Sequence, residues 1–134
     1  MDWKYLKINK LVRDNIPEMT KDEGGFTKFK ILSQQEFLTE IKKKIVEEAQ
    51  EVVDAKDKKE ITTEIGDVLE IIDEIIKVAG LDKQEIEKSR MAKRQERSGY
   101  DKHIFLKSVK VPRDLQEDWV FRYNEITEKE YEND

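Results

Sequence analysis

"VEEAQEVVDAKDKKEITTEIGD", residues 46–67, joins two helical patterns across one short break. The break centres on Asp57, which forms a cap-like pair with Glu60 three residues later. Apolar residues recur every three or four positions over residues 34–55, and the same spacing resumes over residues 58–78. Two amphipathic helices separated by so short a gap are expected to pack as an antiparallel hairpin.

Start and stop signals support these helices and predict a third. Ser33 followed by Glu36 is a capping box at the start of the first helix. Gly80 follows the second helix at the position where glycine commonly ends helices. A third helix is expected over residues 82–98, with Gly99 after it. The predicted fold class is therefore all-α, an antiparallel helical bundle.

The segments that flank the helices are less regular. Residues 26–32, FTKFKIL, and residues 103–111, HIFLKSVKV, are each a candidate for a short strand. We expect one helical domain over residues 1–111, followed by a C-terminal tail over residues 112–134. Within this tail, EDWVFRYNEI is either a helical turn or a docking segment.

The composition excludes several classes of function. Charged residues make up 43% of the 134 residues, yet the net charge is only −5 because the signs are interspersed, which argues against a nucleic-acid-binding surface. Cysteine is absent, so disulfides, thiolate metal sites and a cysteine nucleophile are excluded. No apolar run reaches the length of a membrane span or of a signal peptide. These features predict a soluble cytoplasmic protein without a membrane partner.

The acidic residues on the two helices are arranged in pairs. Glu48 occupies a position in the apolar stripe, where an ionised carboxylate costs several kcal/mol unless a cation meets it. Glu51 lies three residues further on, and Glu64 and Asp67 repeat this spacing on the second helix. If the antiparallel turn centres near residue 57, both pairs lie at one level of the bundle.

Four converging carboxylates suit a hard divalent cation, so Mg²⁺ is expected, with Mn²⁺ as a substitute. The absence of a nearby histidine disfavours zinc and a carboxylate–histidine di-iron site. Gly66 stands in mid-helix between two of the carboxylates, at a cost of about 1 kcal/mol relative to alanine, which indicates a close helix crossing or an approaching ligand. The spacing alone leaves open the alternative of a solvated acidic helix surface.

Three blocks of the sequence resemble a known superfamily. EEAQE followed by EIGD resembles the E-E-x-x-E … E-x-x-D signature of the all-alpha NTP pyrophosphatase superfamily, which includes MazG proteins, dimeric dUTPases and phosphoribosyl-ATP pyrophosphohydrolases. NKLVRDNIPEM, residues 9–19, resembles the K-L-V-R-D-K-I-P opening of one MazG-like branch. KRQERSGYDKHIFL, residues 93–106, resembles the K-R-x-x-R-G-G-F-x-K-x-I-F-L ending of that branch. The resemblance covers residues 9–106.

The resemblance implies a fold, a metal and a site. It implies a MazG-like helical bundle completed by oligomerisation, as a homodimer or a higher homo-oligomer. It also implies that Mg²⁺ is held by Glu48, Glu51, Glu64 and Asp67. The remaining residue of the signature, Glu47, is then the catalytic candidate for orienting or deprotonating the attacking water, either directly or through a second metal ion.

The basic residues of the two flanking blocks are candidate substrate contacts. Lys93, Arg94 and Arg97 cluster near the end of the third predicted helix, and the resemblance implies that they neutralise a triphosphate. The alternative is that they complement the helix dipole. Lys10 and Arg13 are expected to close over the phosphates, unless they are ordinary surface residues.

The function implied is Mg²⁺-dependent hydrolysis of a nucleoside triphosphate between its α- and β-phosphates, giving a nucleoside monophosphate and pyrophosphate, as in the house-cleaning of non-standard nucleotides. The alternatives are a phosphoribosyl-ATP pyrophosphohydrolase and a non-catalytic helical interaction module on the same scaffold. Residues 98–100, Ser-Gly-Tyr, replace the Gly-Gly-Phe of the branch, and His103 stands where a basic residue is usual, so the base and sugar preference stays open.

Overall fold

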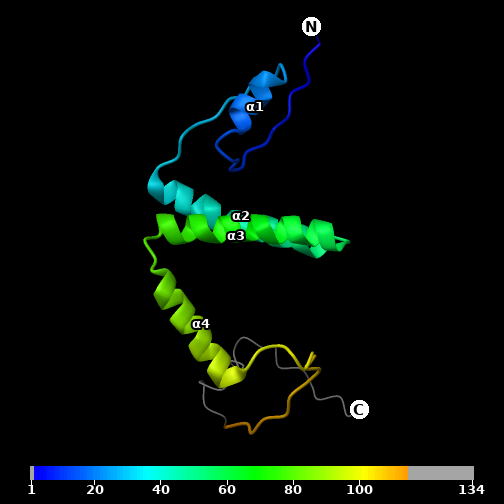
Figure 1. The fold of residues 1–134 in the computed structure, drawn as a ribbon, viewed down its shortest axis with the longest axis vertical. Helices are drawn as coiled ribbons and strands as arrows, with labels where there is room; N and C mark the ends of the chain where they lie inside the picture. The colour runs from blue at the N-terminus through cyan, green and yellow to red at the C-terminus, as the bar shows by residue number, and fades with distance from the viewer. Residues whose placement is uncertain (1, 115–134) are drawn as a thin grey trace. The chain divides into compact units, whose positions relative to one another are not determined.

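The computed structural model describes residues 2–114 of the chain and is all-helical over that range. The helices described there are α1 (Ile16–Asp22), α2 (Gln34–Asp54), α3 (Lys58–Val78) and α4 (Lys83–Arg97) (Figure 1). The chain divides into two compact units, Met1–Gln95 and Glu96–Asp134. The predicted all-α class is confirmed for the described residues.

Helices α2 and α3 form the hairpin that carries the acidic residues. Each helix has 21 residues, and residues 55–57 connect them. The two helices lie side by side (Figure 1), and they make the main contact between helices in the described chain. On α2, Ile41 is buried, with 4% of its surface exposed. The antiparallel hairpin predicted from the short break is thereby confirmed.

The predicted caps explain where α2 and α3 begin. The Ser33 hydroxyl accepts a hydrogen bond from the Glu36 N–H at 3.2 Å, and the Glu36 carboxylate accepts one from the Ser33 N–H at 3.1 Å. The backbone hydrogen bond from Ser33 is the main reason why the pKa of Glu36 is lowered. Asp57 caps α3 by accepting a hydrogen bond from the Glu60 N–H at 2.8 Å. Local signals of a few residues therefore set both helix starts.

Glycine ends one of the two helices for which the sequence predicted it, and a serine takes that place after the other. After α3, Gly80 has a φ of 63°, and the Leu81 N–H donates to the Ile76 carbonyl at 2.9 Å. This arrangement is a Schellman motif, which requires the left-handed conformation that glycine adopts without strain. After α4, the residue with a left-handed conformation is Ser98, at a φ of 68°, and not Gly99, as the sequence predicted.

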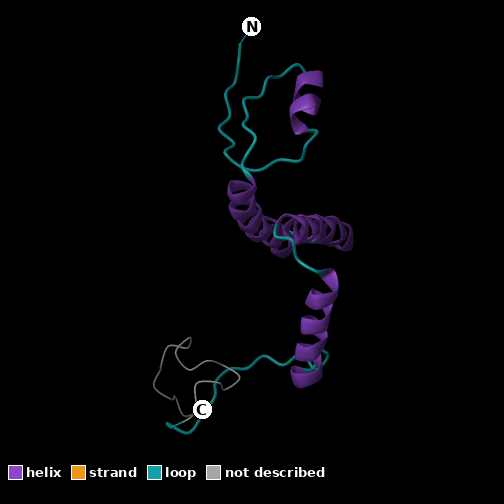
Figure 2. Cartoon of the chain, turned by 90° about the vertical axis from the view of Figure 1, so that its left-hand side faces the viewer, coloured by secondary structure: helices purple, strands orange, loops and turns teal. Residues whose placement is uncertain are grey.

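Two features of the flanking segments differ from the sequence prediction. Residues 26–32 and 103–111 contain no strand, and the described chain consists of helices and loops (Figure 2). A strand needs a partner for its backbone hydrogen bonds, and neither segment has one in the described chain. The short helix α1 was not predicted, although Pro17 lies in its first turn and Glu18 also favours a helix start.

The predicted tail falls largely outside the described residues. Residues 112–114 are irregular, and EDWVFRYNEI, residues 117–126, lies beyond the range that the structure describes. None of the helices in residues 2–114 combines the length and the apolar composition needed to cross a membrane.

Candidate metal centre

Three of the predicted ligands converge between the two hairpin helices. One carboxylate oxygen from each of Glu48, Glu64 and Asp67 lies within 4.8 Å of the others. Glu48 comes from α2, and the other two come from α3. The connecting residues centre on position 56, one residue earlier than predicted, so positions 48 and 64 are equidistant from the turn and face each other. The i,i+3 spacing then brings Asp67 to the same side of α3.

The fourth predicted ligand, Glu51, lies outside this group of three. It lines a pocket nearer the hairpin turn, which it shares with Glu64 and with Asp54, Ala55 and Glu60. Glu51 is close enough to Glu64 to contribute to raising its pKa. The structure therefore brings three of the four carboxylates together and places Glu51 beside them.

Glu64 carries the clearest sign of unneutralised charge in the cluster. Burial is the largest cause that raises its pKa, followed by the negative charges of Asp67, Glu51 and Glu48. Glu64 forms no ion pair with any residue in the described range. A cation bound among these carboxylates would relieve both the desolvation and the repulsion.

Glu47, by contrast, is neutralised by two lysines. Its Oε1 lies 3.0 Å from the Lys10 Nζ, and its Oε2 lies 3.1 Å from the Lys44 Nζ. The hydrogen bond from Lys10, followed by that from Lys44, lowers the pKa of Glu47. The same bond to Glu47 is the main reason why the pKa of Lys10 is raised. Glu47 is therefore held as a carboxylate at neutral pH.

Lys44 is a site residue that the sequence analysis missed. Its Nζ lies 3.8 Å from the Glu48 Oε1, and the two side chains are 17% and 16% exposed. Glu48 thus has a neighbouring cation from its own helix. The sequence contains the signal for this contact. Lys44 precedes Glu47 by three residues and Glu48 by four, which are the spacings of neighbours on one helix face.

The N-terminal segment reaches both helices of the hairpin. Besides the bond from Lys10 to α2, the guanidinium of Arg13 lies 2.9 Å from the Asp67 Oδ1 on α3. The side chains of Lys10 and Arg13 remain 52% and 65% exposed, so they lie at the edge of the acidic cluster and can be reached from solvent. This position is compatible with the predicted contact to phosphates.

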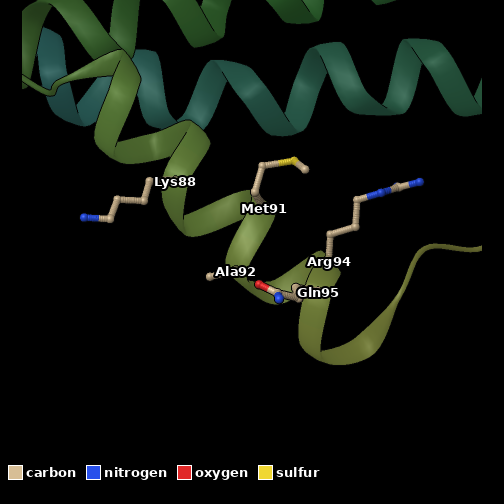
Figure 3. A pocket seen from close by; sticks show the side chains of 5 residues that line it. All are labelled: Lys88, Met91, Ala92, Arg94 and Gln95. Carbon is tan, nitrogen blue, oxygen red and sulfur yellow. The ribbon is translucent and has the colours of Figure 1, made fainter.

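The basic residues of α4 are not linked to the cluster in the described chain. Lys93 and Arg94 form no hydrogen bond or ion pair with the acidic residues of the hairpin in the described range. The Arg97 Nε lies 3.9 Å from the carboxylate of its neighbour Glu96. Arg94 lines a pocket on α4 together with Lys88, Met91, Ala92 and Gln95 (Figure 3). Their role in substrate binding stays a prediction.

Gly66, between Glu64 and Asp67, is not explained by a helix crossing within the described chain. A Cβ atom added at Gly66 would meet nothing within 4 Å. The sequence analysis offered a close helix crossing or an approaching ligand, and the helix crossing is wrong for the described part of the chain. The other explanation, the approach of a ligand, stays a prediction.

Comparisons of the chain with models of known protein families, with curated proteins and with solved structures found no match. The resemblance of the three sequence blocks to the pyrophosphatase superfamily therefore stays a prediction from motifs.

Proposed function

We propose that the protein is a Mg²⁺-dependent nucleoside triphosphate pyrophosphohydrolase. The observation that carries the proposal is the convergence of Glu48, Glu64 and Asp67, which present carboxylate oxygens within 4.8 Å of one another from two antiparallel helices. These residues belong to the two acidic motifs that resemble the superfamily signature. The same helices also carry Glu47, which adjoins Glu48 in the motif.

The donor set fits a hard divalent cation. All three converging groups are carboxylates, which Mg²⁺ and Mn²⁺ prefer, and Mg²⁺ retains waters beside one or two protein carboxylates in many phosphate-handling sites. Glu48, Glu64 and Asp67 would hold the ion, and Glu51 would support it from the adjacent turn. When bound, the ion supplies positive charge to the α-phosphate and lowers the pKa of the attacking water.

The residues of the chain account for the other requirements of the reaction. Glu47 is ionised, and two lysines fix its position. This state suits Glu47 for accepting a hydrogen bond from the attacking water and orienting it. The water oxygen forms a bond to the α-phosphorus and its proton passes to solvent. The bond from that phosphorus to the bridging oxygen breaks, and pyrophosphate leaves with the electron pair. Lys10 and Arg13 stand at the edge of the site, where their charges suit the departing phosphates.

The products test the position of the cut. We expect each nucleoside triphosphate hydrolysed to give one nucleoside monophosphate and one pyrophosphate, since the attack is at the α-phosphorus. Anion-exchange chromatography of the nucleotides and a coupled pyrophosphate assay measure both products, with EDTA-treated protein as the control. A nucleoside diphosphate with orthophosphate would contradict the proposal, and no hydrolysis of any triphosphate in Mg²⁺ would favour a non-catalytic module.

The house-cleaning role concerns the substrate and needs a separate experiment. A panel of standard, oxidised and deaminated triphosphates, together with dUTP and phosphoribosyl-ATP, distinguishes it from the biosynthetic alternative. We expect the highest kcat/KM with one of the non-standard nucleotides. A preference for phosphoribosyl-ATP would overturn the house-cleaning role and leave the reaction type intact.

The proposal includes a homodimer that completes the helical bundle. Large apolar side chains of the hairpin remain exposed, among them Ile65 at 43%, Leu69 at 56% and Val53 at 73%. Such a surface is typical of a face that packs against another chain. Two copies of the hairpin would bury it in a four-helix arrangement.

We therefore expect the protein to sediment as a dimer at micromolar concentration. Leu69→Lys is expected to shift it to a monomer, because a charge would replace an apolar contact in the interface. Analytical ultracentrifugation measures the change, and Thr62→Lys, at an exposed polar position of the same helix, is the control. A monomeric wild-type protein would refute the dimer.

A further inference from the structure

Both oxygens of the Glu47 carboxylate are taken by lysine ammonium groups. Lys10 donates to Oε1 at 3.0 Å from the N-terminal segment, and Lys44 donates to Oε2 at 3.1 Å from within α2. Two ammonium groups carry the same formal charge as one divalent cation. At Glu47, therefore, the positions and the charge that a metal ion would use are already supplied by the chain.

The neighbouring carboxylates differ from Glu47 in this respect. Glu64 has no ion pair in the described chain, and its carboxylate lies within 4.8 Å of those of Glu48 and Asp67. Asp67 uses only one of its two oxygens in its ion pair, with Arg13 at 2.9 Å. A divalent cation is thus attracted to the group of Glu48, Glu64 and Asp67 and repelled from Glu47.

We propose that Lys44, assisted by Lys10, takes the place of a second metal ion at Glu47, so that the centre works with a single divalent cation. The inference rests on the proposed function, and it adds the number of ions and a positioning residue. Lys44 acts through Glu47: it holds the carboxylate in place for the attacking water and keeps further cations away from it.

Lys44 is built into the site, and its neighbour in the sequence is not. The Lys44 side chain is 17% exposed and reaches both Glu47 and Glu48. Lys43 is 68% exposed and pairs with Glu40 at 3.1 Å, on another face of α2. The two lysines share a helix and an i,i+3 ion pair with a glutamate, so Lys43 is a matched control.

The experiment counts Mn²⁺ ions bound to the full chain, by electron paramagnetic resonance of the free ion and by isothermal titration calorimetry. We expect about one ion per chain in the wild-type protein and about two in Lys44→Gln, since an opened Glu47 oxygen, Glu51 and waters suffice for a second ion. Lys43→Gln is expected to bind one ion. Lys44→Arg, which keeps the positive charge, is also expected to bind one.

Lys10→Gln provides a second variant if Lys44→Gln does not fold, as checked by circular dichroism, because Lys10 lies in an exposed segment outside the helices. It is expected to raise the count in the same way by opening the other oxygen. Two ions bound to a wild-type protein that still releases pyrophosphate would overturn this inference and leave the proposed function intact. One ion in both glutamine variants would overturn it as well. No Mn²⁺ binding to the wild-type protein would overturn the metal centre and this inference together.

Discussion

Glu48→Gln is expected to reduce kcat/KM by at least about 100-fold while leaving the metal-free protein as stable as the wild type or more stable. The loss of activity follows because the variant removes a charged ligand from the group of Glu48, Glu64 and Asp67, and even changes to residues that only support a metal ligand commonly cost 10- to 100-fold. The stability of the metal-free protein is retained because the change removes one of three carboxylates that repel one another, and Lys44 keeps its ion pair with Glu47 at 3.1 Å.

Two measurements together identify a metal ligand at this position. Thermal melting with and without Mg²⁺ should show that the ion stabilises the wild-type protein and has little effect on the variant, since a ligand stabilises only the state that binds it. Glu40→Gln is the control, because Glu40 lies on the same helix and pairs with a lysine three residues later, at 3.1 Å. A Glu48→Gln protein with wild-type turnover would rule out the assignment.

Arg97→Ala is expected to lower kcat/KM by roughly 10- to 150-fold with little change in stability, because charge-assisted hydrogen bonds to phosphate contribute about 1.5–3 kcal/mol. Arg97 lies in the last turn of α4. The alternative role is structural, in which its charge complements the helix dipole. In that case the substitution should cost up to about 1 kcal/mol of stability and leave the kinetics unchanged. Its contact with the adjacent Glu96 is long, at 3.9 Å, and contributes little.

Arg90→Ala is the control that shows whether a loss of kcat/KM is specific to Arg97 or follows from removing any arginine of α4. Arg90 lies on the same helix and is 73% exposed, and it donates two hydrogen bonds to Glu87, at 3.0 and 3.1 Å. We expect this variant to keep its kcat/KM. Steady-state kinetics and thermal melting of both variants decide between the two roles: a lowered melting temperature for Arg97→Ala with unchanged kcat/KM would assign Arg97 to the helix surface.

The helices of this protein were predictable because their signals are local. The capping box of Ser33 and Glu36, the cap at Asp57 and the glycine at position 80 each act over a few residues. In the structure, α2 and α3 begin and α3 ends at those signals. Helix α1 carries similar signals at Pro17, but its 7 residues are too short for a periodic pattern. The strand predictions were wrong because alternation describes a single segment, whereas a strand requires a partner.

Helical spacing predicts which residue types face each other across the hairpin, since two i,i+3 acidic pairs at similar distances from one turn must lie at nearly the same level. The convergence of Glu48, Glu64 and Asp67, with Glu51 beside them, follows from the packing of the two helices. A shift of one residue in the centre of the turn changes which side chains meet, and no local signal specifies that shift.

The positions of the basic side chains around the acidic cluster also depend on the tertiary structure. The ion pair of Lys10 with Glu47 spans 37 residues of sequence, and that of Arg13 with Asp67 spans 54. Pairs so distant depend on the path of the N-terminal segment, which capping, periodicity and charge spacing do not describe. Lys44 could have been found from its spacing to Glu47, but its role as a counter-charge became visible only when its Nζ was seen between Glu47 and Glu48. Whether a charge on a helix is solvated or held against another depends on what the rest of the chain brings to it.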